Sequence, residues 1–221
     1  MQRTPEPELM TGEAQARAYA AADFSAGDQA LVQRLLELFP AGLGDVLLDL
    51  GCGLGNISFL LARQFPAAQV LGVDGAAAML RLAEQALASE QALQQRLRFE
   101  QHCLPDPGLA GGYSALVSNS LLHHLHDPQV LWQALPQLGM SGACVYVKDL
   151  RRPPSAEAAI QLQRRYLGDA PAVLQHDYLA SLHAAFTPTE VAQQLEQAGL
   201  ADQLQVAPLE DRYLEVWGRL L

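Results

Sequence analysis

One short segment, Val46 to Gly55, constrains the fold of this chain more than any other. Its first five residues, Val46-Leu47-Leu48-Asp49-Leu50, are almost all apolar and do not alternate with polar ones. Such a run is typical of a strand that helices cover on both faces, as in a parallel α/β sheet. Gly51, Gly53 and Gly55 then occupy alternate positions, where the backbone can turn sharply and approach a ligand that a Cβ would block. Residues 56–63 have helical spacing, so the free N–H groups of a helix start should face whatever lies over the loop.

Strands and helices alternate along the following sequence, which predicts a doubly wound α/β sheet. The expected strands lie at 46–50, 69–73, 97–101, 115–119 and 143–149, and the expected helices at 8–24, 28–39, 54–65, 76–88 and 128–138. Thr187-Pro188-Thr189-Glu190 is typical of a capped helix start, and that helix should end at Gly199. Two last strands, 203–208 and 212–218, are separated by a tight turn. We therefore expect a seven-stranded sheet, mostly parallel, with a C-terminal antiparallel hairpin.

The 221 residues, 50% of them hydrophobic, suffice for a single domain covering residues 1–221. We expect residues 1–40 to form an N-terminal helical cap and residues 151–187 to form an inserted helical lid. Extra chain at the carboxyl ends of such strands is where substrates lie, although a helix pair that only packs is the alternative. The mean hydropathy of +0.04 argues against a membrane span, and the polar start of the chain does not look like a signal peptide.

The net charge is −10 and Lys148 is the only lysine. We expect no nucleic-acid partner, because phosphate binding needs clustered cations. The residue four positions before Lys148 is Cys144, so the Tyr-x-x-x-Lys of short-chain dehydrogenases is missing, and no P-loop lysine follows a glycine. The three cysteines are far apart and odd in number, which indicates a reduced, cytoplasmic protein.

The glycine segment resembles the first motif of class I S-adenosylmethionine-dependent methyltransferases, and the resemblance extends over nearly the whole chain. The dinucleotide fingerprint Gly-x-Gly-x-x-Gly fits less well, because the third glycine comes one residue early. The resemblance implies a Rossmann-like fold, S-adenosyl-L-methionine as cofactor, S-adenosyl-L-homocysteine as product and a small-molecule substrate. It assigns the following residues to the cofactor loop: Asp49, Gly51, Cys52, Gly53, Gly55 and Asn56.

Asp74 ends the second strand, nineteen positions after Gly55. An acid at this place accepts hydrogen bonds from both ribose hydroxyls in nucleotide-binding α/β sheets, although Asp74 could also cap the next helix. Gly75 adjoins it, and Met79, one turn further, should contact the adenine or the core. Tyr19, in the helix before the sheet, is a candidate for closing over the cofactor.

Many relatives carry an acid after the third strand that holds the adenine amino group. This chain has His102 or Cys103 there. We expect the backbone groups of Cys103 and Leu104, or the side chain of Gln101, to take that place.

The fourth strand leads into Leu122-His123-His124-Leu125, which resembles the post-strand motif of the small-molecule branch of the family. By this resemblance Asn119 lies beside the sulfonium and orients cofactor or substrate, and His123 faces the substrate. Asp149, which closes the fifth strand, is expected to orient the substrate. The clustered histidines could suggest a metal site, but Asp127 is the only acid near them in sequence and is better explained as a helix cap, so we expect no metal.

The resemblance implies transfer of a methyl group by in-line displacement to an O, N, S or C atom, which the sequence leaves open. An alcohol or amine acceptor would need a base such as His123, whereas a carboxylate or thiolate would not. A non-catalytic S-adenosylmethionine-binding protein and a nicotinamide-dependent oxidoreductase are the alternatives. The oligomeric state, monomer or homodimer, stays open.

Overall fold

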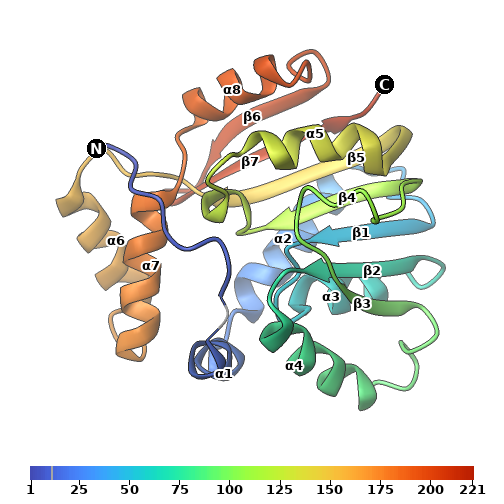
Figure 1. The fold of residues 1–221 in the computed structure, drawn as a ribbon, viewed down its shortest axis with the longest axis horizontal. Coiled ribbons are helices and arrows are strands. Elements are labelled where there is room, and N and C mark those ends of the chain that lie inside the picture. Colours follow the sequence, from blue (N-terminus) through green and yellow to red (C-terminus); the bar gives the residue numbers. More distant parts are fainter. Residues whose placement is uncertain (11) are drawn as a thin grey trace.

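A computed structural model describes residues 1–10 and 12–221 (Figure 1). Within these residues, seven strands form one sheet in the order β3-β2-β1-β4-β5-β7-β6. Strands β1 to β5 are parallel, and β7 runs antiparallel to both of its neighbours, β5 and β6. The strands are β1 Val46–Leu50, β2 Gln69–Asp74, β3 Leu97–Gln101, β4 Tyr113–Asn119, β5 Gly139–Leu150, β6 Leu204–Leu209 and β7 Tyr213–Arg219. The predicted α/β sheet with its C-terminal antiparallel hairpin is confirmed.

Helices cover both faces of this sheet (Figure 1). On one face pack α2 Ser25–Leu38, α3 Asn56–Gln64 and α4 Ala77–Ala88; on the other pack α5 Gln129–Leu138 and α8 Pro188–Gln197. The turn η1 Leu122–His124 follows β4, and α1 Glu13–Ala21 contacts α4 and α7. The insertion forms two paired helices, α6 Ala156–Leu167 and α7 Ala172–Ala184, at one end of the molecule.

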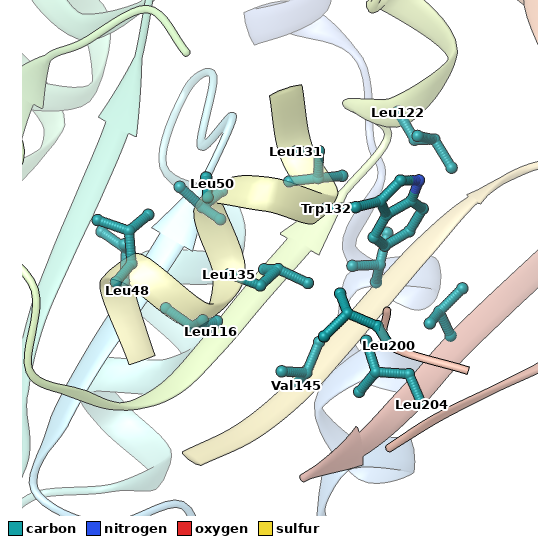
Figure 2. Close-up of a cluster of buried hydrophobic side chains, with 14 of the residues drawn as sticks. Leu48, Leu50, Leu116, Leu122, Leu131, Trp132, Leu135, Val145, Leu200 and Leu204 are labelled. Carbon is teal, nitrogen blue, oxygen red and sulfur yellow. The ribbon is translucent and has the colours of Figure 1, made fainter. Parts of the chain in front are cut away.

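The core on the α5 face shows why the apolar runs form strands covered on both sides (Figure 2). Trp132 and Leu135 of α5 are fully buried and pack in one cluster with Leu48 and Leu50 of β1. The indole Nε1 of Trp132 donates a hydrogen bond to Oε1 of Gln194, at 2.9 Å. That bond satisfies the ring's one polar atom and ties α5 to α8.

The largest differences from the expected boundaries are at the start of the fifth strand and at the start of the first helix. The fifth strand begins at Gly139 rather than at residue 143, because Gly139 pairs with Tyr113 across an irregularity in β4. The helix expected over 8–24 is shorter, since α1 covers only Glu13–Ala21. Residues 1–10, called the N-terminal arm here, contain no helix; their polar groups bond instead to η1, α7 and the loop before α6.

None of the helices in the described parts of the chain is both long and apolar enough to cross a membrane.

Candidate active site

A cavity of about 780 Å³ opens at the carboxyl ends of the parallel strands. Its walls come from the loops after β1, β2 and β4, from α1, the arm and the insertion, and from the start of β7. It lies where chain connectivity reverses between β1 and β4, the position at which open α/β sheets bind their ligands.

The glycines of the loop after β1 serve different purposes. Gly51 has φ +71°, and a Cβ there would lie 2.9 Å from Leu121, so only glycine allows the loop to pass this side chain. Gly55 begins α3 with φ +80°, and a Cβ there would lie 2.5 Å from the ring of Phe99. Gly51 and Gly53 border the cavity, whereas Gly55 does not. Gly55 therefore lets α3 pack closely against β3, and does not form the cavity wall.

Asp74 holds the glycine loop in place. Its Oδ2 accepts a hydrogen bond from the N–H of Gly53 at 2.8 Å, and its Oδ1 accepts one from the N–H of Ala76 at 2.7 Å. The carboxylate thus joins the loop after β1 to the start of α4 and borders the cavity between them. The helix-start contact expected from the sequence occurs at this residue, and its ribose-binding role stays a prediction.

Two further carboxylates line the same end of the cavity. Asp49 is almost fully buried beneath the loop and accepts a hydrogen bond from the hydroxyl of Ser58 at 2.6 Å. Asp28 of α2 accepts one from the amide of Asn56 at 3.1 Å. Burial raises the pKa of Asp49 to about 7 and also raises the pKa of Asp28 and Asp74. In the described parts of the chain the hydrogen-bond partners of all three acids are neutral, so this end of the cavity favours a cation.

Apolar and backbone groups follow Asp74 along the cavity. Met79 is buried, and it lines the cavity together with Gly75, Cys103 and Leu104. Gln101 does not border the cavity, because its amide donates to the carbonyl of Gly75 at 3.1 Å.

Other residues bound this side of the cavity. Nδ1 of His102 lies 2.8 Å from a carboxylate oxygen of Asp106. Tyr19 lines the cavity from α1 and packs beside Phe24, with ring centroids 5.9 Å apart.

The structure pairs two residues that the sequence analysis proposed separately. His123 is 3% exposed, and its Nδ1 lies 2.5 Å from Oδ1 of Asp149. Asp149 also accepts the backbone N–H groups of Leu122 and Leu150, each at 2.7 Å. His123 borders the cavity, as does Asn119, but Asp149 lies behind the imidazole. Asp149 therefore holds the imidazole of His123 in place. Its carboxylate does not border the cavity, so the expectation that Asp149 itself orients the substrate is not supported.

The arm brings an acid to the histidine motif that sequence proximity did not reveal. Oε1 of Glu6 lies 3.4 Å from Nε2 of His123 and 3.4 Å from Nδ1 of His124, close enough for the three groups to share one cation. Asp127, the acid considered from the sequence, instead accepts the N–H of Gln129 at 2.9 Å. That no metal binds here stays a prediction. It can no longer be argued from the lack of an acid near the histidines, because Glu6 lies beside them.

The protonation of this cluster follows from its burial. Burial raises the pKa of Glu6. Burial together with the charge of His123 lowers the pKa of His124 to about 3. Burial acts in the same direction on His123, but the charge and hydrogen bond of Asp149 outweigh it, so the pKa of His123 is raised. His124 is therefore a neutral imidazole at physiological pH.

The insertion contributes two tyrosines to the cavity wall. Tyr166 and Tyr178 line the cavity, whereas His176 and His183 do not. Asp177 accepts a hydrogen bond from Gln15 at 2.7 Å and so attaches α7 to α1. Arg151 and Arg152 also lie off the cavity wall, bonded to backbone carbonyls and to Glu190.

Residues 48–144 match the family model described as "Methyltransferase domain". The match covers the glycine loop, Asp74 and the histidine motif, and the sheet around them has the mixed seven-stranded order described above. This stretch, a little under half of the chain, is similar to methyltransferase domains. Among curated methyltransferases, trans-aconitate 2-methyltransferase of Azoarcus sp. (strain BH72) is 34% identical over 60% of this chain and 44% of its own length. The trans-aconitate 2-methyltransferase of Deinococcus radiodurans is 43% identical over 40% of this chain and 33% of its own length.

Ubiquinone biosynthesis O-methyltransferase of Xanthomonas axonopodis pv. citri is 29% identical over 74% of this chain and 65% of its own. The chain thus spans about half or less of the first two curated relatives. A SAM-dependent methyltransferase from Aquifex aeolicus superposes with a TM-score of 0.67 at 15% identity, covering 94% of this chain and 98% of that one. The plantazolicin methyltransferase BamL superposes with a TM-score of 0.71 at 14% identity, covering 94% of this chain and 96% of BamL. These two structures share the methyltransferase fold with this chain.

Proposed function

We propose that this chain is an S-adenosyl-L-methionine-dependent methyltransferase that acts on a small molecule. The observation that supports this most is the placement of Asp74 between the glycine loop and α4, at an end of the cavity lined by three carboxylates. An acceptor-only carboxylate suits the ribose diol, and the acids suit the positive charges of the sulfonium and the ammonium group. Met79 and Leu104 offer the apolar surface that an adenine ring requires.

The cofactor supplies a methyl group on sulfonium sulfur, and the protein's residues supply the alignment. Asn119 orients the ligands at the end of β4, and the arm, α1 and the insertion exclude water from the cavity. Positioning of this kind can give effective molarities of about 10⁵ M or more. Towards an alcohol or an amine, Nε2 of His123 takes the acceptor's proton, while Asp149 holds the imidazole and stabilises its positive charge. Towards a carboxylate, His123 only orients the acceptor.

We also propose that residues 1–221 act as one domain, with residues 1–40 as a cap and 151–187 as a lid. The arm and α7 support this, since both border the cavity. A cytoplasmic location without a nucleic-acid partner agrees with three free thiols, one lysine and a net charge of −10. Curated relatives named for trans-aconitate and for ubiquinone biosynthesis support a small-molecule acceptor. Monomer and homodimer are equally open.

Calorimetry tests the cofactor assignment. Wild-type protein should bind S-adenosyl-L-methionine and S-adenosyl-L-homocysteine but not NADH. Asp74→Asn should weaken this binding by about 1.5–3 kcal/mol, the usual worth of a hydrogen bond to a charged group. Asp45→Asn, the same change at an exposed residue off the cavity, is the control. Equal affinities of the two variants would refute the role of Asp74, and no binding by wild type would refute the function.

A second experiment separates an enzyme from a binding protein. Incubation with methyl-labelled cofactor and a fractionated metabolite extract should place label in at least one small molecule. Cofactor binding without any labelled product would favour the non-catalytic S-adenosylmethionine-binding protein.

A further inference from the structure

Lys148 is a buried cation without a counterion among the residues that the structure describes. It is 6% exposed, lines the cavity, and lies opposite Asn119 in the register of β4 and β5. Its Nζ lies 4.2 Å from the ring centroid of Tyr213, and no carboxylate of the described residues comes within ion-pair distance of it. A buried charge without a partner is costly unless a ligand supplies one.

The acids nearest to Lys148 are already engaged or exposed. Glu215 forms an ion pair with Arg34 at 2.8 Å, and Asp28 accepts from Asn56. Glu210 lies in the exposed turn before β7. Burial lowers the pKa of Lys148, in keeping with an ammonium group that no neighbour neutralises.

Arg212 forms a second cation beside it, held by aromatic rings and not by an acid. Its guanidinium carbon lies 3.5 Å from the ring centroid of Tyr166 and 4.7 Å from that of Tyr213. The hydroxyl of Tyr166 donates to Asp211 at 2.7 Å, which fixes that ring. Stacking occupies the faces of the guanidinium and leaves its N–H edge available, and Nε of Arg212 is buried with no acceptor among the described residues.

Tyr178 adds a third unsatisfied group from the insertion. Its hydroxyl is buried and has no hydrogen-bond partner in the described chain. It lies near enough to the guanidinium of Arg212 to favour the charged form of that residue, without reaching hydrogen-bond geometry. Three polar groups, on β5, in the turn before β7 and on α7, thus line the cavity, and each can donate to the same anion.

We propose that Lys148, Arg212 and Tyr178 form a subsite for an oxyanion of the methyl acceptor, a carboxylate or a phosphate. The proposal rests on the proposed function, because it assigns this end of the cavity to the acceptor. Two cations and a hydroxyl supply charge-assisted hydrogen bonds to one planar or tetrahedral oxyanion. Asp49 and Asp74 instead lie at the glycine loop and the start of α4, so an anionic acceptor and a cationic donor are drawn to different parts of the cavity.

Calorimetry at constant ionic strength tests the subsite. The probes are succinate, propane-1,2,3-tricarboxylate and glycerol 3-phosphate, with dimethyl succinate and the trimethyl tricarboxylate as neutral counterparts. Titrations are made with and without S-adenosyl-L-homocysteine. At least one anion should bind wild type more tightly than the neutral esters. Preference for the carboxylates or for glycerol 3-phosphate identifies the oxyanion.

The variants are Lys148→Met, Arg212→Gln and Tyr178→Phe, with Arg164→Gln as the control, since Arg164 is exposed and lies off the cavity. Lys148→Met and Arg212→Gln should each weaken anion binding by about tenfold or more, and Tyr178→Phe by several-fold. Arg164→Gln should stay within twofold of wild type. Binding of S-adenosyl-L-homocysteine should be the same in all five proteins.

The free energy of unfolding distinguishes a ligand-binding role of Lys148 and Tyr178 from a purely structural one. Lys148→Met and Tyr178→Phe remove buried groups that have no partner, so their urea midpoints should equal or exceed that of wild type. A fall in midpoint together with lost anion binding would overturn the subsite. So would anions that bind no better than the esters, or a control that loses as much affinity as Arg212→Gln. If S-adenosyl-L-homocysteine fails to bind wild type but the anions bind as expected, the proposed function fails, and the three residues remain an oxyanion site that is no longer assigned to a methyl acceptor.

Discussion

Two glycines of the same loop should respond differently to alanine. Gly53 and Gly55 both have positive φ, +53° and +80°. A Cβ on Gly53 would meet nothing within 4 Å, whereas a Cβ on Gly55 would lie 2.5 Å from Cζ of Phe99. Gly53→Ala therefore adds only the backbone strain of a left-handed residue, about 1–2 kcal/mol. Gly55→Ala adds overpacking of about 1–3 kcal/mol to that strain, so we expect a loss of about 2–5 kcal/mol in the free energy of unfolding.

Urea denaturation of both variants measures these losses. For a chain of this size a loss of 1 kcal/mol lowers Tm by about 2–4 °C, so Gly55→Ala should melt about 4–20 °C below wild type. The steric part should be recovered when Phe99→Leu is added to Gly55→Ala, but not when it is added to Gly53→Ala. A double-mutant cycle should therefore give a coupling of about 1–3 kcal/mol for the first pair and near zero for the second.

Cofactor binding should show the opposite order. Gly53 borders the cavity and Gly55 does not. Gly53→Ala should weaken binding of S-adenosyl-L-methionine more than Gly55→Ala, measured where both variants are fully folded. Equal losses of stability in the two variants, or no coupling between positions 55 and 99, would refute the packing role given to Gly55.

The remaining predictions concern three other sites. Because the pKa of His123 is raised, its charged form stabilises the fold below pH about 6.5, and this contribution is lost as the pH rises through the folded-state pKa. Asp149→Asn should lower the His123 pKa seen by NMR and flatten that dependence; an unchanged pKa contradicts the pairing. Asp49, with a pKa of about 7, favours the folded state most below its unfolded pKa, and this contribution is lost as the pH rises from about 4 to 7. Since a cationic ligand prefers ionised Asp49, affinity for S-adenosyl-L-methionine should rise from pH 5.5 to 8 in wild type and stay flat in Asp49→Asn. Thr187→Ala removes the cap of α8 and should cost about 1 kcal/mol in thermal unfolding, whereas Thr189→Ala in the same turn should not.

The sheet could be predicted because its signals are local. The run Val46 to Leu50 and the glycines after it specify a buried strand and a turn without reference to the remainder of the chain. The cap at Thr187 likewise specifies the start of α8 from four consecutive residues. The first helix was overestimated because its alanine-rich composition says nothing of the hydrogen bond that Glu8 accepts from the backbone N–H of His126.

The site could be predicted only in part, because its groups depend on contacts between distant segments. His123 and Asp149 were each proposed from their place after a strand, but their pairing requires β4 and β5 to be neighbours with η1 folded between them. Glu6 and Arg212 carry no motif, and the lack of a counterion that marks Lys148 is a property of the packed molecule. A solitary lysine at the carboxyl end of a strand was the one sequence signal that pointed towards this subsite.

The cavity's opposite charges come from opposite sides of the sheet's midline. Asp49 and Asp74 stand on β1 and β2, and the cations Lys148 and Arg212 stand on β5 and in the turn before β7. Under the proposed function, substitutions of Lys148 and Arg212 can therefore change which acceptor is methylated, while the residues that bind S-adenosyl-L-methionine stay the same. Related proteins with this arrangement of charges can therefore acquire different acceptors through changes within residues 148–213 alone.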